Sequence, residues 1–277
     1  MTDGTDAKTP IPVSWRRKKG LREMLALLLD FQRGGTVQDA VQDALQQFVG
    51  VPVQVVCAGR TDAGVHATGQ VVHFDTAVER SMFAWVRGTN SFLPPAVAVR
   101  WARPVTDDFH ARFSAYARRY RYLLINRAHR TGVWNGRVGW YHHPLDVGTM
   151  QAAAHLLLGE RDFSAFRAAE CQANSPVKVM REAHVRRFGD LIAFDFEASA
   201  FLHHMVRNLV GSLVHVGQGK RPPEWIGELL AAGDRRLAAP TFAAAGLYLF
   251  AVRYPPELGL PSGDQTNLTP CIPLYGQ

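Results

Sequence analysis

Apolar and polar positions divide the chain between residues 21 and 101 into six elements. Met24–Leu29 is apolar enough for a buried strand, although a short helix also fits this run. Apolar residues recur at helical spacing from Val37 to Phe48, and Thr36 with Asp39 predicts a capping box where that helix begins. The other predicted elements are strands over Val51–Val56 and Gln70–Phe74, a helix over Glu79–Val86 and a strand over Val97–Trp101. This order of strand, helix, two strands, helix and strand is typical of a ferredoxin-like α+β unit.

The second half of the chain repeats the alternation of helices and strands. A helix is predicted over Val147–Leu158, and a hairpin follows whose two strands meet at Gly189-Asp190. The apolar residues from Leu202 to Val216 lie on one face of a helix and therefore belong to the core. The remaining elements are the hairpin strands Val179–Phe188 and Leu191–Glu197, a helix over Glu224–Leu230 and a strand over Leu247–Arg253. The two halves share this order of elements without visible sequence similarity.

Changes in composition predict four parts of the chain. Residues 1–20 are polar and basic, and we expect them to form a disordered leader. A first ferredoxin-like domain is predicted over residues 21–107 and a second over residues 108–254. Residues 255–277 are rich in Pro and Gly, which predicts an irregular tail.

Net charge is the outstanding feature of the composition. The chain has 277 residues, of which 47% are hydrophobic and 20% charged, as in an ordinary soluble globular protein. It carries 31 Lys and Arg against 24 Asp and Glu, a net charge of +7, so its surface should attract polyanions, and nucleic acid before a membrane. No apolar run approaches the roughly 18 residues of a membrane span. We therefore expect a cytoplasmic protein that makes no membrane contact.

The cysteines and histidines argue against a metal centre. The 3 cysteines are widely spaced and odd in number, which indicates a reducing compartment without disulfides or a zinc site. The chain has 11 histidines, and the two adjacent pairs His142-His143 and His203-His204 invite a metal site. Adjacent side chains diverge in a helix or a strand, however, so neither pair is expected to bind a metal.

Residues 109–145 contain no Asp or Glu and mix arginines with aromatic residues. Guanidinium groups neutralise phosphates and aromatic faces stack on bases, so this mixture suits a surface that holds RNA. The alternative is a strand with solvated arginines on one face and core tyrosines on the other. The residues in question are Arg112, Arg118, Arg119, Arg121, Arg127, Arg130 and Arg137, with Phe113, Tyr116, Tyr120, Tyr122, Trp134 and Trp140.

The segment from Cys57 to Ala67 places a guanidinium and a carboxylate two residues apart between two glycines. It joins two predicted strands, and Arg60 is expected to bond the carboxylate of Asp62 and to keep it ionised. An ionised, oriented aspartate can act as a nucleophile. Asp between glycines is also ordinary turn chemistry, and a structural turn remains the alternative. The segment lacks the glycine order of a dinucleotide or phosphate loop, which disfavours an enzyme with a nucleotide cofactor.

Five segments together resemble the TruA family of tRNA pseudouridine synthases. They occur in the family's order and span about residues 36–254: Gly59–His66, Asp107–Ser114, Arg118–Tyr122, Phe201–Asn208 and Gly246–Leu249. The resemblance implies two ferredoxin-like α/β-sandwich domains with joined antiparallel sheets and a basic central cleft, in a homodimer that binds tRNA. It also implies isomerisation of uridine to pseudouridine at positions 38, 39 and 40 of the anticodon stem-loop, a reaction that needs no cofactor and no metal.

The same resemblance suggests roles for individual side chains. Asp62 would attack the sugar carbon or ring carbon 6, or take a proton from the sugar, and the sequence does not choose among these routes. Arg60 would hold Asp62 ionised or fill the space that the flipped uridine leaves. Tyr120 would stack on the uracil and is a candidate for proton transfer. The predicted substrate-binding residues are Tyr120, Arg118, Arg121, Arg207 and Leu247, although Arg207 equally suits a surface arginine and Leu247 a core residue.

One departure from the family lies near the N-terminus. Members usually carry a Tyr-Asp-Gly turn and a Gly-Trp-Gln segment between the first strand and the first helix, whereas here Leu29 is separated from Thr36 by Asp-Phe-Gln-Arg-Gly-Gly. About ten residues of a loop that would line the cleft are absent, more than ordinary loop variation removes. The alternative function is therefore a noncatalytic or weakly active tRNA-binding protein on the same scaffold.

Overall fold

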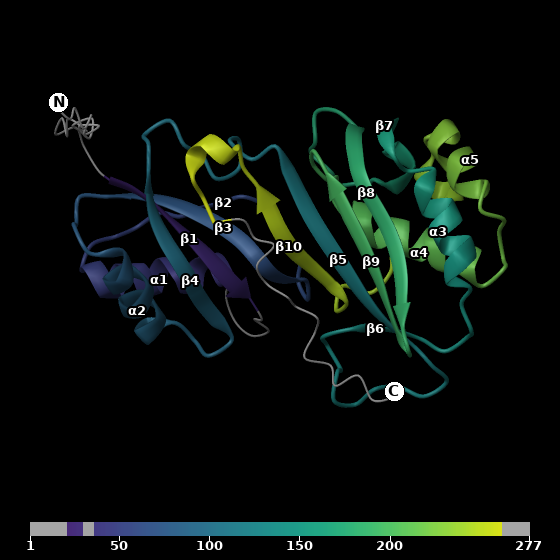
Figure 1. The fold of residues 1–277 in the computed structure, drawn as a ribbon, viewed down its shortest axis with the longest axis horizontal. Coiled ribbons are helices and arrows are strands. Elements are labelled where there is room, and N and C mark those ends of the chain that lie inside the picture. Colours follow the sequence, from purple (N-terminus) through teal and green to yellow (C-terminus); the bar gives the residue numbers. More distant parts are fainter. Residues whose placement is uncertain (1–20, 30–35, 262–277) are drawn as a thin grey trace, which may run out of the picture.

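The computed structural model describes residues 21–29 and 36–261, and for residues 21–29 it describes only the backbone. This part of the chain is a mixed α/β structure built on one open sheet, shown in Figure 1. The strands follow the order β4-β1-β3-β10-β5-β9-β8-β7, while β2 pairs with β3 and β6 pairs with β5. The leader, the segment from Asp30 to Gly35 and the end of the tail lie outside the described residues.

The first half of the chain supplies one end of the sheet. Its elements are β1 (Leu21–Leu29), α1 (Val37–Val49), β2 (Val56–Cys57), β3 (His66–Thr76), α2 (Met82–Phe92) and β4 (Val97–Val105). The strand pairs β1–β3, β1–β4 and β2–β3 are all antiparallel. The predicted order of elements in this half is confirmed.

The second half supplies the other end of the sheet. Its helices and strands are β5 (Ala117–Asn126), β6 (Gly139–Tyr141), α3 (Val147–His155), β7 (Gly159–Asp162), β8 (Val177–Phe188), β9 (Leu191–Ala198), α4 (Met205–Gly217), α5 (Trp225–Ala232) and β10 (Leu247–Arg253). The hairpin of β8 and β9 turns at Gly189, whose φ is 57°, as its Gly-Asp pair predicts. The short strands β6 and β7 were not predicted from the sequence.

Side-chain hydrogen bonds explain where several elements begin. The capping box of α1 is confirmed, because the Asp39 amide donates to Thr36 Oγ1 over 3.2 Å and the Thr36 amide donates to the Asp39 carboxylate over 2.8 Å. The helix predicted over Glu79–Val86 is misplaced, because Ser81 caps α2 through the amide of Ala84 and α2 starts only after that cap.

The strand predicted over Val51–Val56 is wrong in most of its length, since β2 contains only Val56 and Cys57. The reason lies in the backbone of Val55, whose N–H donates to Gln42 Oε1 and whose carbonyl accepts from Gln38 Nε2. Side chains of α1 therefore take the hydrogen bonds that a neighbouring strand would otherwise supply.

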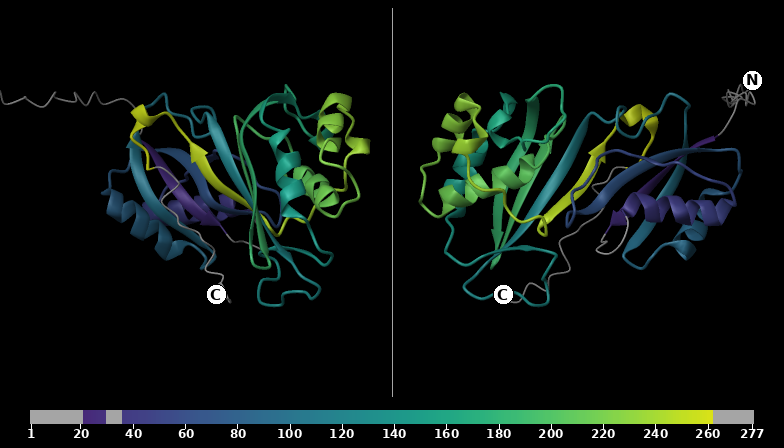
Figure 2. Two further views of the ribbon diagram at one scale, coloured as in Figure 1. Left: turned by 45° about the vertical axis from the view of Figure 1, so that its right-hand side comes forward. Right: turned by 180° about the vertical axis from the view of Figure 1, so that it is seen from behind.

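Each half has its own core on the helical face of the sheet. Val41, Leu45 and Trp85 pack α1 and α2 on the first half, while α3, α4 and α5 cover the second half through residues such as Leu209. The views of Figure 2 show the two groups of helices at opposite ends of the sheet. Tyr120 on β5 packs against both cores and so marks the middle of the sheet. None of the helices within the described ranges has the length and apolar character needed to span a bilayer.

The two halves of the sheet join where β3 and β10 run parallel. Tyr248 pairs with His66 and Leu249 pairs with Ala67, and the strands then stay close at Gly69. A Cβ atom at position 69 would lie 2.7 Å from the carbonyl carbon of Phe250 and would also clash with the neighbouring backbone. Backbone atoms of a paired strand cannot move aside cheaply, so this position needs glycine.

The first prediction concerns this close approach. Gly69→Ala should lower the free energy of unfolding by about 2 kcal/mol or more, because the new methyl group forces β3 and β10 apart. Urea unfolding followed by circular dichroism measures the change. Gly132→Ala is the control, since a Cβ atom there meets nothing within 4 Å. Equal stability of the two variants would contradict the assignment of Gly69 as a packing requirement.

Candidate active site

The loop between β2 and β3 presents Asp62, and its backbone is fixed at both ends. At the start, the buried side chain of Gln70 accepts from the Gly59 amide over 3.3 Å and donates to the Gly59 carbonyl over 2.6 Å. At the end, the Val65 amide donates to the Asp62 carbonyl over 3.0 Å, and Gly64 has a left-handed φ of 77°. A left-handed turn of this kind suits glycine, and it leaves the Asp62 side chain free to point away from the loop.

The start of α4 faces this loop. His204 precedes the helix with a φ of 60°, and it is the one residue other than glycine with a positive φ in the described part of the chain. The left-handed backbone brings the rings of His203 and His204 side by side, with centroids 4.0 Å apart and planes inclined by 32°. The expectation that these adjacent side chains diverge is wrong, because it assumed a regular helix or strand. The rings of His142 and His143 also lie close, at 3.9 Å.

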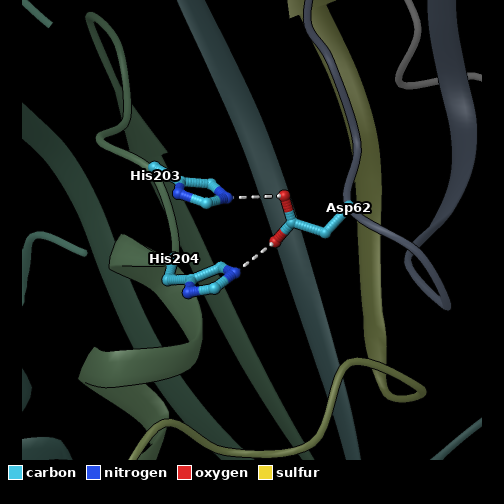
Figure 3. Close-up of side chains that lie close together, drawn as sticks. All are labelled: Asp62, His203 and His204. Atoms are coloured by element: carbon cyan, nitrogen blue, oxygen red, sulfur yellow. Dashed lines mark hydrogen bonds and ion pairs between the residues drawn. The ribbon is translucent and has the colours of Figure 1, made fainter. Parts of the chain in front are cut away.

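Both histidines contact the Asp62 carboxylate, as Figure 3 shows. Nε2 of His203 lies 3.2 Å from Oδ1, and Nε2 of His204 lies 3.2 Å from Oδ2. Nη1 of Arg207, from the first turn of α4, lies 3.5 Å from Oδ2. The carboxylate therefore receives hydrogen-bond donors from the second half of the chain on both of its oxygens.

The expected ion pair between Arg60 and Asp62 is not formed. Arg60 is exposed, and the cation that approaches Asp62 is Arg207. The sequence did not reveal His203 and His204 as partners of Asp62, because the contact joins segments about 140 residues apart through the tertiary fold. The His-His-Met-Val-Arg run over residues 203–207 is the signal that the sequence contains for this contact.

Burial favours the neutral form of His204. The pKa of His204 is lowered chiefly by burial, and the opposing charge of Asp62 does not outweigh this effect. A neutral ring with hydrogen on Nε2 can donate to the carboxylate. The ligand atoms of Asp62, His203 and His204 lie within 4.8 Å of one another, and within the ranges described here they are the one group of this kind that a metal ion could use. The nearby charge of Arg207 opposes a second cation at this carboxylate.

Tyr120 lies beside the loop, as predicted. Its hydroxyl comes close to Gly59, and its ring meets Phe201 edge-on with centroids 4.9 Å apart. Burial raises the pKa of Tyr120 to about 12, and the nearby charge of Asp62 acts in the same direction. The hydroxyl therefore keeps its proton at neutral pH and can donate a hydrogen bond.

Arg207 and Leu247 lie on the second half of the structure. Besides its contact with Asp62, Arg207 donates from Nε to the Phe242 carbonyl over 2.8 Å, which fixes the guanidinium. It is therefore a residue of the site rather than a solvated surface arginine. Leu247 is 6% exposed and is paired with Tyr122 in the core of this half.

Arg118 is bound to the protein's own backbone. Its guanidinium donates to the carbonyl groups of Ala58, Arg112, Ala115 and Ser199. Ala58 lies at the start of the Asp62 loop, so Arg118 connects this loop to the two segments beside it. These donors are consequently unavailable to a substrate phosphate.

Arg121 lies on the opposite face of β5 from Tyr120, because side chains alternate along a strand. Its Nε donates to Asp195 Oδ1 over 2.7 Å, and its guanidinium covers the ring of Phe250 at 4.5 Å. Burial acts to raise the pKa of Asp195, but Arg121 and Arg186 outweigh this effect and the pKa is lowered. The structure thus does not bring Arg121 to Asp62.

The second prediction tests the role of Arg118. Arg118→Lys keeps the positive charge but cannot reach all four carbonyl groups, so the free energy of unfolding should fall by about 1–3 kcal/mol. Chemical denaturation measures it, with the exposed Arg80→Lys as the control. A variant with the parent's stability but weaker tRNA binding would instead make Arg118 a phosphate contact.

Comparison with known proteins connects this site to one family. A family model described as tRNA pseudouridine synthase matches residues 32–114 and 153–255. The chain is 65% identical over 235 residues to tRNA pseudouridine synthase A of Dechloromonas aromatica, covering 85% of this chain and 90% of the relative. It is 60% identical over 228 residues to the protein of that name from Methylibium petroleiphilum, covering 82% and 88% of the two chains. The Thiobacillus denitrificans protein of that name is 58% identical over 229 residues, covering 83% and 88%.

Proposed function

Because the chain belongs to the tRNA pseudouridine synthase family, we propose that it isomerises uridine to pseudouridine in tRNA, at positions 38, 39 and 40 of the anticodon stem-loop. The observation that carries the proposal is the Asp62 carboxylate, which is held by His203, His204 and Arg207 inside the region that matches the family. The proposed partner is tRNA, and the cytoplasm is the proposed location of the reaction.

Asp62 is the proposed catalytic residue. The bond from uracil N1 to the ribose must break, the ring must turn, and a bond from C5 to the ribose must form, while C5 loses a proton and N1 gains one. Product and substrate have the same composition, so the reaction needs neither a redox cofactor nor a group donor. Attack on the sugar carbon, attack on ring carbon 6 and removal of a sugar proton all require an ionised carboxylate. A hydrogen-bonded carboxylate beside Arg207 meets this requirement.

Tyr120, Leu247 and Arg60 complete the proposed base-binding site. The ring of Tyr120 would stack on the flipped uracil, and its hydroxyl, which keeps its proton at neutral pH, could donate a hydrogen bond to the base. Arg60, which is exposed and makes no ion pair with Asp62, is available to enter the space that the flipped base leaves. Leu247 would contact the base from the start of β10.

The proposed tRNA surface lies where two ferredoxin-like units meet. The strand orders β4-β1-β3-β2 and β10-β5-β9-β8 support this division, since each is the order expected of such a unit. Exposed arginines of the 109–145 stretch lie over aromatic rings, as with Arg112 on Phe113 and Arg130 on Trp140. These pairs support a basic cleft that contacts phosphates and bases. The homodimer remains part of the proposal on the family resemblance.

The third prediction tests Asp62 directly. Asp62→Asn keeps the side chain's size but removes the nucleophilic charge, so pseudouridine formation should fall by at least about 1,000-fold, or 4 kcal/mol. The affinity for tRNA should change little, because one carboxylate contributes little beside many phosphate contacts. Chemical mapping of pseudouridine and filter binding measure the two quantities.

Three outcomes separate the candidate functions. A parent protein that forms pseudouridine and an inactive Asp62→Asn variant support the synthase. A parent that binds tRNA without forming pseudouridine would establish the noncatalytic alternative. An active Asp62→Asn variant would mean that Asp62 is only a turn residue.

The fourth prediction concerns the salt dependence of tRNA binding. The logarithm of the affinity should fall linearly with the logarithm of the salt concentration, and Arg130→Gln should flatten the slope by about one unit. Arg121→Gln is the matched control, because the guanidinium of Arg121 is bound to Asp195 on the face of β5 away from Tyr120. Binding that does not change in a salt titration of the parent would contradict a phosphate-binding surface.

A further inference from the structure

His204 combines an unfavourable backbone with a contact to the reactive group. A left-handed conformation is unfavourable for a residue with a Cβ atom, so it persists only where the surroundings impose it. His204 adopts this conformation with a φ of 60°, and its side chain does not cap α4. The ring is instead directed at Asp62, with Nε2 3.2 Å from Oδ2.

Backbone hydrogen bonds on both sides hold this conformation in place. The His203 amide donates to Cys171 Sγ over 3.3 Å, and the His203 carbonyl accepts from the Ala168 amide over 3.0 Å. The His204 carbonyl accepts from the Asn208 amide over 3.0 Å, which starts α4. The peptide groups next to His204 are therefore fixed by the second half of the structure.

The two rings determine the plane of the Asp62 carboxylate. His203 binds Oδ1 and His204 binds Oδ2, so rotation of the carboxylate about the Cβ–Cγ bond would lose both contacts. The loop's own guanidinium, Arg60, is exposed and supplies no such restraint. Among the described residues, Oδ1 has His203 as its one partner and so keeps a lone pair for the substrate, while Oδ2 is approached by both His204 and Arg207.

We propose that His204 is a positioning residue for the Asp62 carboxylate, and that His203 completes the pair by holding the second oxygen. The inference rests on the proposed function, in which Asp62 reacts with the uridine. The left-handed backbone of His204 is unfavourable, but it directs the ring from the second half of the structure to Asp62 in the first half. Loss of the ring releases the carboxylate, and a displacement of the reacting group by about 1 Å can lower a rate about 100-fold.

His204→Gly is the decisive variant, because glycine adopts a left-handed backbone without strain and the variant should fold at least as well as the parent. We expect the single-turnover rate at saturating tRNA to fall about 100-fold, while the dissociation constant for tRNA stays within about twofold. His204→Gln keeps a side-chain N–H near the position of Nε2 and should recover at least about tenfold of this loss. His203→Ala should show a smaller decrease than His204→Gly.

His142→Ala is the matched control, since His142 also lies against a neighbouring histidine but has no carboxylate partner among the described residues. Its rate should equal that of the parent. A His204→Gly variant as fast as the parent would overturn the inference. So would a His204→Gln variant as slow as His204→Gly, since a polar contact with Asp62 would then not be the cause.

Nuclear magnetic resonance of ¹⁵N-labelled histidine tests the geometry without activity. The Nε2 signals of His203 and His204 should shift in Asp62→Asn and remain in place in His142→Ala. Unchanged signals in Asp62→Asn would overturn the inference. A parent that forms no pseudouridine but shows these shifts would contradict the proposed function and leave the held carboxylate established.

Discussion

The parallel join between β3 and β10 is the constraint on which the site depends. Each half of the structure has its own core, and β10 of the second half pairs with β3 of the first. Gly69 permits the two backbones to approach there, where a Cβ atom would meet the Phe250 and Ala251 backbone. Asp62 comes from one half and its hydrogen-bond donors come from the other, so the site exists only while the halves are joined.

A buried polar network fixes the side of the site that supplies these donors. Asn208 in α4 is fully buried, and its Nδ2 donates to the Phe166 carbonyl over 2.8 Å. Its Oδ1 accepts from Thr241 Oγ1 and from Arg235 Nη2. A fully paired buried network permits one arrangement and is costly to disrupt. The first turn of α4 therefore has a rigid base, which is what a restrained carboxylate requires.

The sequence predicted local structure well and the site's contacts poorly. Thr36 and Asp39 lie within one turn, so they specify the capping box without help from distant residues. The strand Leu247–Arg253 is likewise predicted by its own apolar run. The contact between His204 and Asp62 depends on the packing of two halves and on a left-handed backbone that no periodicity reveals. The family resemblance predicted roles for Asp62 and Tyr120, but it did not show which cation approaches the carboxylate.

The arginine-rich stretch shows why a count of charges overstates a nucleic-acid surface. Alternation along β5 sends its arginines to two faces with different partners. On the face away from Tyr120, arginines of β5 and of the strands β8 and β10 form ion pairs with acidic side chains of the sheet. These pairs are Arg119–Glu182, Arg121–Asp195, Arg186–Asp195 and Arg253–Glu197. Arg118 on the other face is bound to carbonyl groups. The positive charge available to phosphates therefore lies in the exposed loops before and after β5. These loops, rather than the strand itself, would attract tRNA, while the sheet holds the Asp62 loop in place.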